Sequence, residues 1–160
     1  MNDLGRLSSA LHFEDCAIGT SWHSAGRTIT EGDLGTFVNL SWFHEELFTN
    51  QHDRSGTAIP GRPVPLAMVF AMSEGLILPS IDGTGLAFLN FDLDAKGPAF
   101  IGDTLYVHCK VVEARLTSKA DRGLVRTENT VRKASGDMVL VYRPLRLMKL
   151  RISSASGKSS

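Results

Sequence analysis

An almost wholly apolar run, Leu66–Leu78, constrains the fold more than any other stretch of this 160-residue sequence. Its polar side chains occur only near the end, at Ser73 and Glu74. A helix that is apolar on all sides belongs in a core, and this run of about 13 residues is too short to span a membrane, which needs roughly 20. Pro65 suits the first helical turn, and Pro79 marks the stop. The run therefore predicts one buried helix that another layer must wrap.

Strand-like runs after this helix are the predicted wrapping layer. In residues 104–114, apolar and polar residues alternate with the period of two that is typical of a half-buried strand. A hairpin signal follows at 134–137, and Pro144 indicates an edge strand or a bulge. One apolar face and one polar face favour an antiparallel sheet with one side on the helix and the other in water. The predicted strands are 86–93, 104–114, 124–133 and 138–152.

The first half of the chain predicts shorter elements. Residues 20–28 favour a strand. Thr28 or Thr30 can cap an amphipathic helix over 31–40, because Glu31 or Asp33 follows three residues later. Residues 41–50 then predict a short helix or turn against the core.

Composition indicates a single domain over 1–152, followed by a small, polar tail at 153–160 that we expect to be disordered. Equal numbers of basic and acidic residues give a net charge of zero, so we expect neither nucleic acid nor a membrane as a partner. The sequence begins without a basic segment followed by an apolar run, so we expect no signal peptide and a cytoplasmic location.

Cysteine spacing gives no metal signature. Cys16 and Cys109 are predicted to be free thiols, with a lone disulfide as the alternative. We predict no metal and no cofactor.

Several short motifs, taken in order, resemble the MaoC-like acyl-CoA hydratase/dehydratase family, and the resemblance covers roughly 13–151. Residues 112–127 are most similar to the branch that includes mesaconyl-CoA hydratase-like proteins. The motifs are Phe13-Glu14-Asp15 with Gly19, Gly26-Arg27-Thr28-Ile29-Thr30-Glu31-Gly32-Asp33, Gly61-Arg62 and Gly102-Asp103-Thr104-Leu105-Tyr106-Val107.

The resemblance implies an α+β hot-dog fold, in which an antiparallel sheet wraps a long central helix. It also implies a homodimer or higher oligomer, with the pantetheine arm of an acyl-CoA or acyl-carrier-protein thioester in a tunnel at the subunit interface. Active members carry an Asp and a His, in a pattern like G-D-x-N-P-x-H, that act through a water across the α,β double bond. The N–H of a Gly that follows a His at the start of the helix polarises the thioester carbonyl.

This sequence departs from that pattern at the catalytic positions. Ser41-Trp42 stands where Gly-Asp is expected, His44-Glu45 falls near the Asn-Pro, and Leu47 or Phe48 replaces the His. The catalytic pair therefore cannot be carried over to this chain.

A substitute acid/base is available nearby, at His44 with Glu45 or Glu46. An imidazole poised by a carboxylate suits general acid–base chemistry near neutral pH. The alternative is that these three residues form the solvated face of a short helix. The buried side of that helix would be Trp42, Phe43, Leu47 and Phe48.

At the start of the buried helix, Pro65 and Leu66 replace the His-Gly pair. The backbone N–H of Leu66 or Ala67 can still donate to an oxyanion, because the first N–H groups of a helix are unpaired. Arg62 either meets a phosphate of the carrier arm or packs at the helix start. The predicted substrate-binding residues are Trp42, Phe43, Phe48, Arg62, Val64, Leu66 and Ala67.

Glu74 is unusual inside an apolar helix. A buried, unpaired carboxylate is costly, so we expect a partner or a place at the helix edge, and a role in the pocket is the alternative. His108 is expected at the surface or at an interface.

Two classes of function remain open. The first is a hydratase or dehydratase of the MaoC-like type, or an enzyme of a related dehydration or cyclisation, with non-standard catalytic residues. The second is a non-catalytic acyl-thioester-binding protein or the structural partner of an active subunit. A hot-dog thioesterase needs a carboxylate near the helix start, which 63–65 does not supply.

Overall fold

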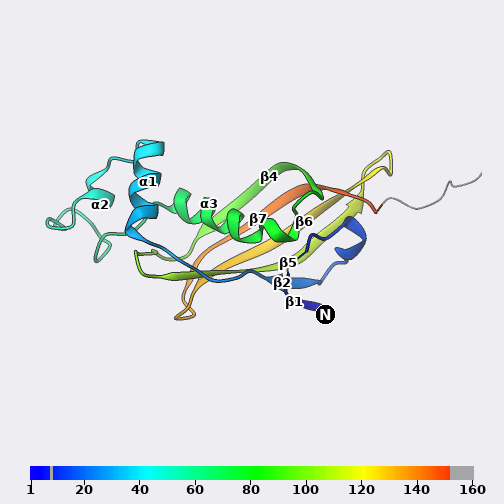
Figure 1. Cartoon of the computed structure of the whole chain (residues 1–160), viewed down its shortest axis with the longest axis horizontal. Helices are drawn as coiled ribbons and strands as arrows, with labels where there is room; N and C mark the ends of the chain where they lie inside the picture. The colour runs from blue at the N-terminus through cyan, green and yellow to red at the C-terminus, as the bar shows by residue number, and fades with distance from the viewer. Residues whose placement is uncertain (8, 152–160) are drawn as a thin grey trace, which may run out of the picture.

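A computed structural model describes residues 1–7 and 9–151, in which a curved sheet partly encloses one long helix (Figure 1). The fold is α+β, as predicted. The predicted tail at 153–160 lies outside the described residues, and the boundary of the single domain stays a prediction. The elements are β1 (Asp3–Arg6), β2 (Ser21–His23), β3 (Arg27–Thr28), α1 (Glu31–Ser41), α2 (Glu46–Thr49), α3 (Leu66–Ile77), β4 (Gly85–Ala95), β5 (Thr104–Leu116), β6 (Arg122–Lys133) and β7 (Met138–Lys149), with 3-10 turns at Phe13–Asp15 and Leu78–Ser80.

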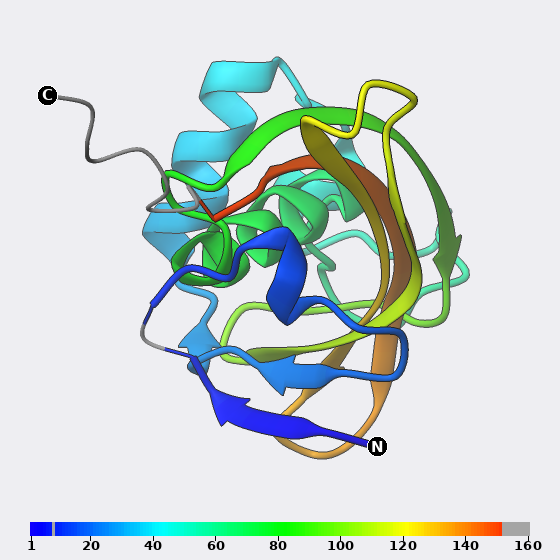
Figure 2. The same ribbon diagram turned by 90° about the vertical axis from the view of Figure 1, so that its right-hand side faces the viewer.

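The sheet has the order β1-β2-β5-β6-β7-β4, and β3 also pairs with β5. Every pairing is antiparallel except that of β1 with β2, which is parallel and which the sequence analysis did not predict. Figure 2 shows the long strands curving around one side of α3. No helix in the described ranges is long and apolar enough to cross a membrane.

The core lies between α3 and the concave face of the sheet. The alternation predicted in β5 is confirmed, because Leu105 and Val107 are fully buried while Tyr106 and His108 are exposed. Buried side chains from β5, β6 and β7 pack in one cluster with α3 residues such as Met68. Pairing and burial therefore fix which face of each strand meets the helix.

Burial of α3 on all sides, which the apolar run predicted, is wrong for the chain by itself. Met68, Val69 and Ser73 are buried, whereas Leu66, Ala67, Ala71 and Gly75 are exposed. The sheet covers one side of the helix, and its apolar residues on the other side face outward. An apolar helix face without a cover is typical of a surface that meets another protein.

The predicted cap of α1 is confirmed. Thr30 Oγ1 accepts from the N–H of Asp33 at 3.1 Å, and Asp33 accepts from the N–H of Thr30 at 2.9 Å. Arg27 adds an ion pair to Asp33 at 2.6 Å.

One strand prediction needs correction, and the structure decides between the two alternatives for Pro144. The strand predicted over 20–28 is interrupted between β2 and β3. At Gly26 the Tyr106 ring lies so close that a Cβ would sit 2.6 Å from it. Because β7 lies between β6 and β4, Pro144 is not on an edge strand. The structure supports the bulge alternative, because the β4–β7 pairing is irregular between Phe88 and Asn90, close to Pro144, which cannot donate to the ladder.

Candidate functional site

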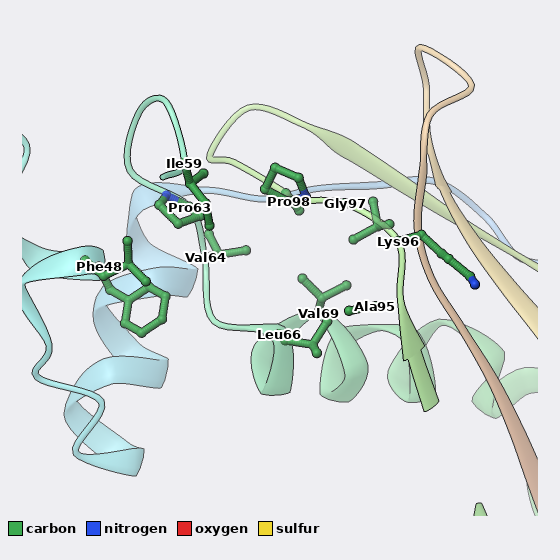
Figure 3. Close-up of a pocket in the computed structure, with 13 residues that line it drawn as sticks. Phe48, Ile59, Pro63, Val64, Leu66, Val69, Ala95, Lys96, Gly97 and Pro98 are labelled. Carbon is green, nitrogen blue, oxygen red and sulfur yellow. The ribbon is translucent and has the colours of Figure 1, made fainter. Parts of the chain in front are cut away.

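An apolar pocket of about 390 Å³ opens at the N-terminal end of α3 (Figure 3). This volume falls within the range of roughly 300–1,000 Å³ that is typical of small-molecule sites. The pocket is built by α2 and the loop after it, the approach to α3, α3 itself, the end of β4 and β7. Its lining residues are Leu47, Phe48, Ile59, Pro63, Val64, Leu66, Val69, Ala95, Lys96, Gly97, Pro98, Ala99 and Val139.

Backbone hydrogen bonds hold the walls of the pocket in place. The N–H of Val64 donates to the carbonyl of Ala99 at 2.9 Å, next to an isolated bridge between Pro63 and Phe100. The N–H groups of Lys96 and Gly97 both donate to the carbonyl of Val139, at 2.8 and 3.1 Å. The two loops are thereby fixed to each other and to β7, and their apolar side chains are left to form the cavity.

The first turn of α3 presents unpaired N–H groups at the pocket. Pro65 is the N-cap residue and contributes no side-chain cap, and the first turn holds no acidic residue. The N–H groups of Met68 and Val69 bond to the carbonyl of Pro65 at 3.0 and 3.2 Å. Leu66 and Ala67 precede them, so their N–H groups have no acceptor within the helix. The partial positive charge of the helix end therefore stays available for an acceptor.

The His44 segment lies beside this pocket and not in it. Helix α1 ends at Trp42, whose φ of 63° places it in the left-handed region and turns the chain before α2. His44, Glu45 and Glu46 are exposed and do not line the apolar pocket. Glu45 and Glu46 line a neighbouring hollow of about 470 Å³ that shares Leu47 and Ile59 with the pocket.

The predicted aromatic residues divide into two groups. Phe48 is buried and lines the pocket. Trp42 is 80% exposed and Phe43 is 39% exposed, so in the chain by itself neither has the burial that the solvated-face alternative assigned to it. Phe43 packs between Phe37 and Phe48, with ring centroids 5.7 and 6.1 Å apart. Their roles in substrate binding stay predictions.

The remaining predicted binding residues lie at the approach to α3. Val64 and Leu66 line the pocket, whereas Ala67 is exposed on the outer side of the helix. Arg62 pairs with Glu31 of α1 at 2.5 Å. This ion pair corresponds to the packing alternative for Arg62, and contact with a phosphate stays a prediction.

The partner predicted for Glu74 is present. Arg146 Nη2 donates to both carboxylate oxygens of Glu74 at 2.7 Å, and the Tyr142 hydroxyl donates to Oε1 at 2.7 Å. Burial, together with the charge of Glu74, raises the pKa of the Tyr142 phenol far above its usual value. Glu74 does not line the apolar pocket.

Sequence reasoning missed the wall formed by 95–99 and Val139. The Lys96-Gly97-Pro98 run directly follows the end of β4 at Ala95, and its own sequence marks only the end of a strand. The residues that line the pocket with it come from other parts of the chain, so periodicity could not reveal the wall. Cys16 and Cys109 are free and buried, and no group of three or more His, Cys, Asp or Glu in the described ranges could hold a metal ion.

No family model matches the sequence. Two curated proteins are similar to it. Mesaconyl-CoA hydratase of Cereibacter sphaeroides is 26% identical over 142 residues, which cover 86% of this chain and 40% of that protein. Beta-methylmalyl-CoA dehydratase of Chloroflexus aurantiacus is 27% identical over 132 residues, which cover 81% of this chain and 38% of that protein. The chain thus spans about 40% of the length of the curated relatives it matches.

Solved structures show the same fold. A putative MaoC domain protein dehydratase from Chloroflexus aurantiacus superposes with a TM-score of 0.85 at 23% identity, covering 96% of this chain and 44% of that one. The Mycobacterium tuberculosis protein Rv0216, described as a double hot-dog fold, superposes with a TM-score of 0.75 at 18% identity, covering 92% of this chain and 47% of that one. The resemblance predicted from the sequence is therefore confirmed, and the chain is a hot-dog domain similar to MaoC-like hydratases and dehydratases.

Proposed function

We propose that this chain binds an acyl thioester and adds or removes water at the α,β double bond. The acyl group occupies the apolar pocket, and the thioester carbonyl faces the first turn of α3. The observation that carries the proposal is the meeting of these two features, because Leu66 belongs both to the pocket wall and to the uncapped helix end. The printed names of both curated relatives describe water chemistry on CoA thioesters, which supports the reaction class.

The helix end supplies the electrophilic part of the chemistry. When water adds to the β-carbon, negative charge develops on the thioester oxygen. The N–H groups of Leu66 and Ala67 stabilise that charge if the oxygen lies about 2.7–3.1 Å away. Donors fixed in a helix need no rearrangement during the reaction, which is the source of their advantage over water.

His44 is the proposed acid/base, with Glu45 or Glu46 orienting its imidazole. The imidazole takes a proton from the water as its oxygen bonds to the β-carbon and the C=C π electrons move into the enolate, and the imidazolium then returns a proton to the α-carbon. The assignment is supported by proximity along the chain, since Leu47 and Phe48, three and four residues after His44, line the pocket. A positioned acid/base contributes typically about 10²–10⁴-fold to the rate.

Binding without chemistry is the second candidate function. It is favoured by the composition of the pocket wall, in which Lys96 is the single titratable residue. In that case the chain serves as the thioester-binding partner of a catalytic subunit.

A hydration assay separates the two functions. Wild type, His44→Ala and the control His52→Ala are compared on enoyl-CoA thioesters of several chain lengths, followed at the enoyl absorbance. His52 is an exposed histidine in the loop after α2 and does not line the pocket. A fall of about a hundredfold or more in turnover for His44→Ala alone supports the enzyme. Binding without turnover on any chain supports the second function, and full turnover in His44→Ala rejects His44.

We also propose that the chain forms a homodimer through β4. This strand is at the open edge of the sheet, and Leu86, Phe88, Leu89 and Phe91 are exposed along it. An uncovered, apolar edge is prone to pair with another strand, and α3 exposes its apolar side as well. Ala95, at the end of β4, lines the pocket, so a partner on this edge would border the bound thioester.

A further inference from the structure

We propose that the acyl group held by this pocket is an uncharged hydrocarbon chain and not a carboxylated one. This inference rests on the proposed function and narrows its substrate class. The proposed acyl group differs from those in the names of the two curated relatives, because mesaconyl and methylmalyl groups both carry a free carboxylate.

The lining of the pocket offers a carboxylate no partner side chain. Of its 13 lining residues, 12 have an apolar side chain or none. The inner wall consists of Val64, Val69, Ala99 and Val139, all of which are buried. Such a surface favours methylene and methyl groups.

Lys96 is the one charged residue of the lining, and its side chain leaves the cavity. Figure 3 shows its ammonium group directed away from the space between Val64, Val69 and Pro98. Lys96 is also exposed, so its charge is satisfied by water. It does not act as a counter-ion for a carboxylate inside the pocket.

Three backbone donors at the pocket are already engaged. The N–H groups of Val64, Lys96 and Gly97 donate to the carbonyls of Ala99 and Val139. The free N–H groups at the start of α3 are those that the proposed function assigns to the thioester carbonyl. A carboxylate in the pocket would therefore lose its water without gaining a hydrogen bond from these groups, which is costly for any charge.

Equilibrium binding to matched thioesters tests this inference without depending on turnover. Calorimetry compares butyryl-CoA, hexanoyl-CoA and adipoyl-CoA. Adipoyl-CoA matches hexanoyl-CoA in chain length, but a carboxylate replaces its terminal methyl group. Each added methylene is expected to tighten binding about fourfold, since burying a CH₂ contributes about 0.8 kcal/mol. Adipoyl-CoA is expected to bind more than about tenfold more weakly than hexanoyl-CoA.

Three variants locate the effect. Leu66 lines the pocket and is 38% exposed, so Leu66→Lys adds a cation at the wall without disturbing the core. We expect it to raise the affinity for adipoyl-CoA relative to hexanoyl-CoA by about tenfold or more. Lys96→Met is expected to leave the ratio of the two affinities unchanged, as is Lys110→Met, a control on the outer face of β5.

The outcomes separate this inference from the proposed function. Equal or tighter binding of adipoyl-CoA by the wild type overturns the hydrocarbon inference, while hydration of any enoyl-CoA would still uphold the reaction. A loss of adipoyl-CoA affinity in Lys96→Met, but not in Lys110→Met, also overturns it. Preference for hexanoyl-CoA without hydration of any enoyl-CoA upholds the inference and rejects the water chemistry. Absence of binding to all three thioesters overturns both.

Discussion

Arg146 on β7 donates from Nη2 to both carboxylate oxygens of Glu74 on α3, at 2.7 Å each. The same guanidinium lies over the Phe88 ring of β4, 4.8 Å from its centroid. One buried cation thus joins the central helix to two strands. A carboxylate in an apolar helix requires a partner, and Arg146 is that partner. We therefore interpret Glu74 as a structural residue.

Replacement of Glu74 by alanine is expected to destabilise the protein strongly. Arg146 is 8% exposed, so the variant leaves a buried charge without its partner. Removing one member of a buried ion pair costs about 3–5 kcal/mol, and the partial exposure of Glu74 favours the lower end. Urea unfolding measures the change.

Glu128→Ala is the matched control for that experiment. Glu128 pairs with Arg143 at 2.9 Å on the outer surface, where such pairs contribute about 0–1 kcal/mol. Equal decreases in the free energy of unfolding of the two variants would contradict the structural role of Glu74.

Acid should weaken the cap of α1. The hydrogen bond from the N–H of Thr30, with further help from Arg27, holds the pKa of Asp33 below its usual value of 3.8. A group whose pKa is lowered by folding stabilises the fold above its unfolded pKa, and this contribution is lost as the pH falls through the folded value. Asp33→Asn is therefore expected to unfold more easily at pH 7, by about 1 kcal/mol. Its stability should also fall less than that of the wild type between pH 5 and pH 2.

Stability curves of both proteins at several pH values check this expectation. Parallel curves for wild type and Asp33→Asn across the acid range would show that the charge of Asp33 does not stabilise the helix.

Neither cysteine should react in the folded protein. Burial, with the nearby charges of Asp15 and Glu14, raises the pKa of the Cys16 thiol to about 12. Burial likewise raises the pKa of Cys109 well above its usual value. Because the thiolate is the reactive form, a thiol reagent at pH 8 is expected to modify no cysteine in buffer and two per chain in urea. Modification of two cysteines per chain in buffer would contradict the burial of Cys16 and Cys109.

If the chain dimerises through the exposed edge of β4, a charged substitution on that edge should weaken the dimer. Sedimentation velocity should show a dimer for the wild type at micromolar concentration and a larger monomer fraction for Leu89→Lys, which places a charge on the exposed edge. Leu40→Lys is the control, because Leu40 is an exposed leucine on α1 and not on β4. A monomeric wild type, or equal dissociation in both variants, contradicts the interface.

Local patterns predicted the parts of the fold that local physics decides. The alternation in β5 identified its buried face, and Thr30 with Asp33 located the start of α1. In both cases the interacting groups lie within a few residues of one another. The resemblance to MaoC-like proteins supplied the global arrangement, because pairing of β4 with β7 joins residues about 50 positions apart.

The candidate site was harder to predict because distant segments build it. Phe48, Val64 and Leu66 were expected near the substrate, and all three line the pocket. Val139 and the turn after β4 could not be assigned, since nothing in their own sequence marks them as neighbours of α3. The solvated-face alternative placed Trp42 on the buried side of a short helix, but its left-handed backbone ends α1 and its side chain is in solvent.

The most direct test of the central claim is an NMR titration of the ¹⁵N-labelled protein with hexanoyl-CoA, a saturated thioester that cannot be hydrated. If the carbonyl binds at the start of α3, the amide signals of Leu66 and Ala67 will shift more than that of Gly136, in the hairpin between β6 and β7. Saturable binding with no shift at Leu66 and Ala67 beyond that at Gly136 would contradict the claim that the end of this helix receives the thioester.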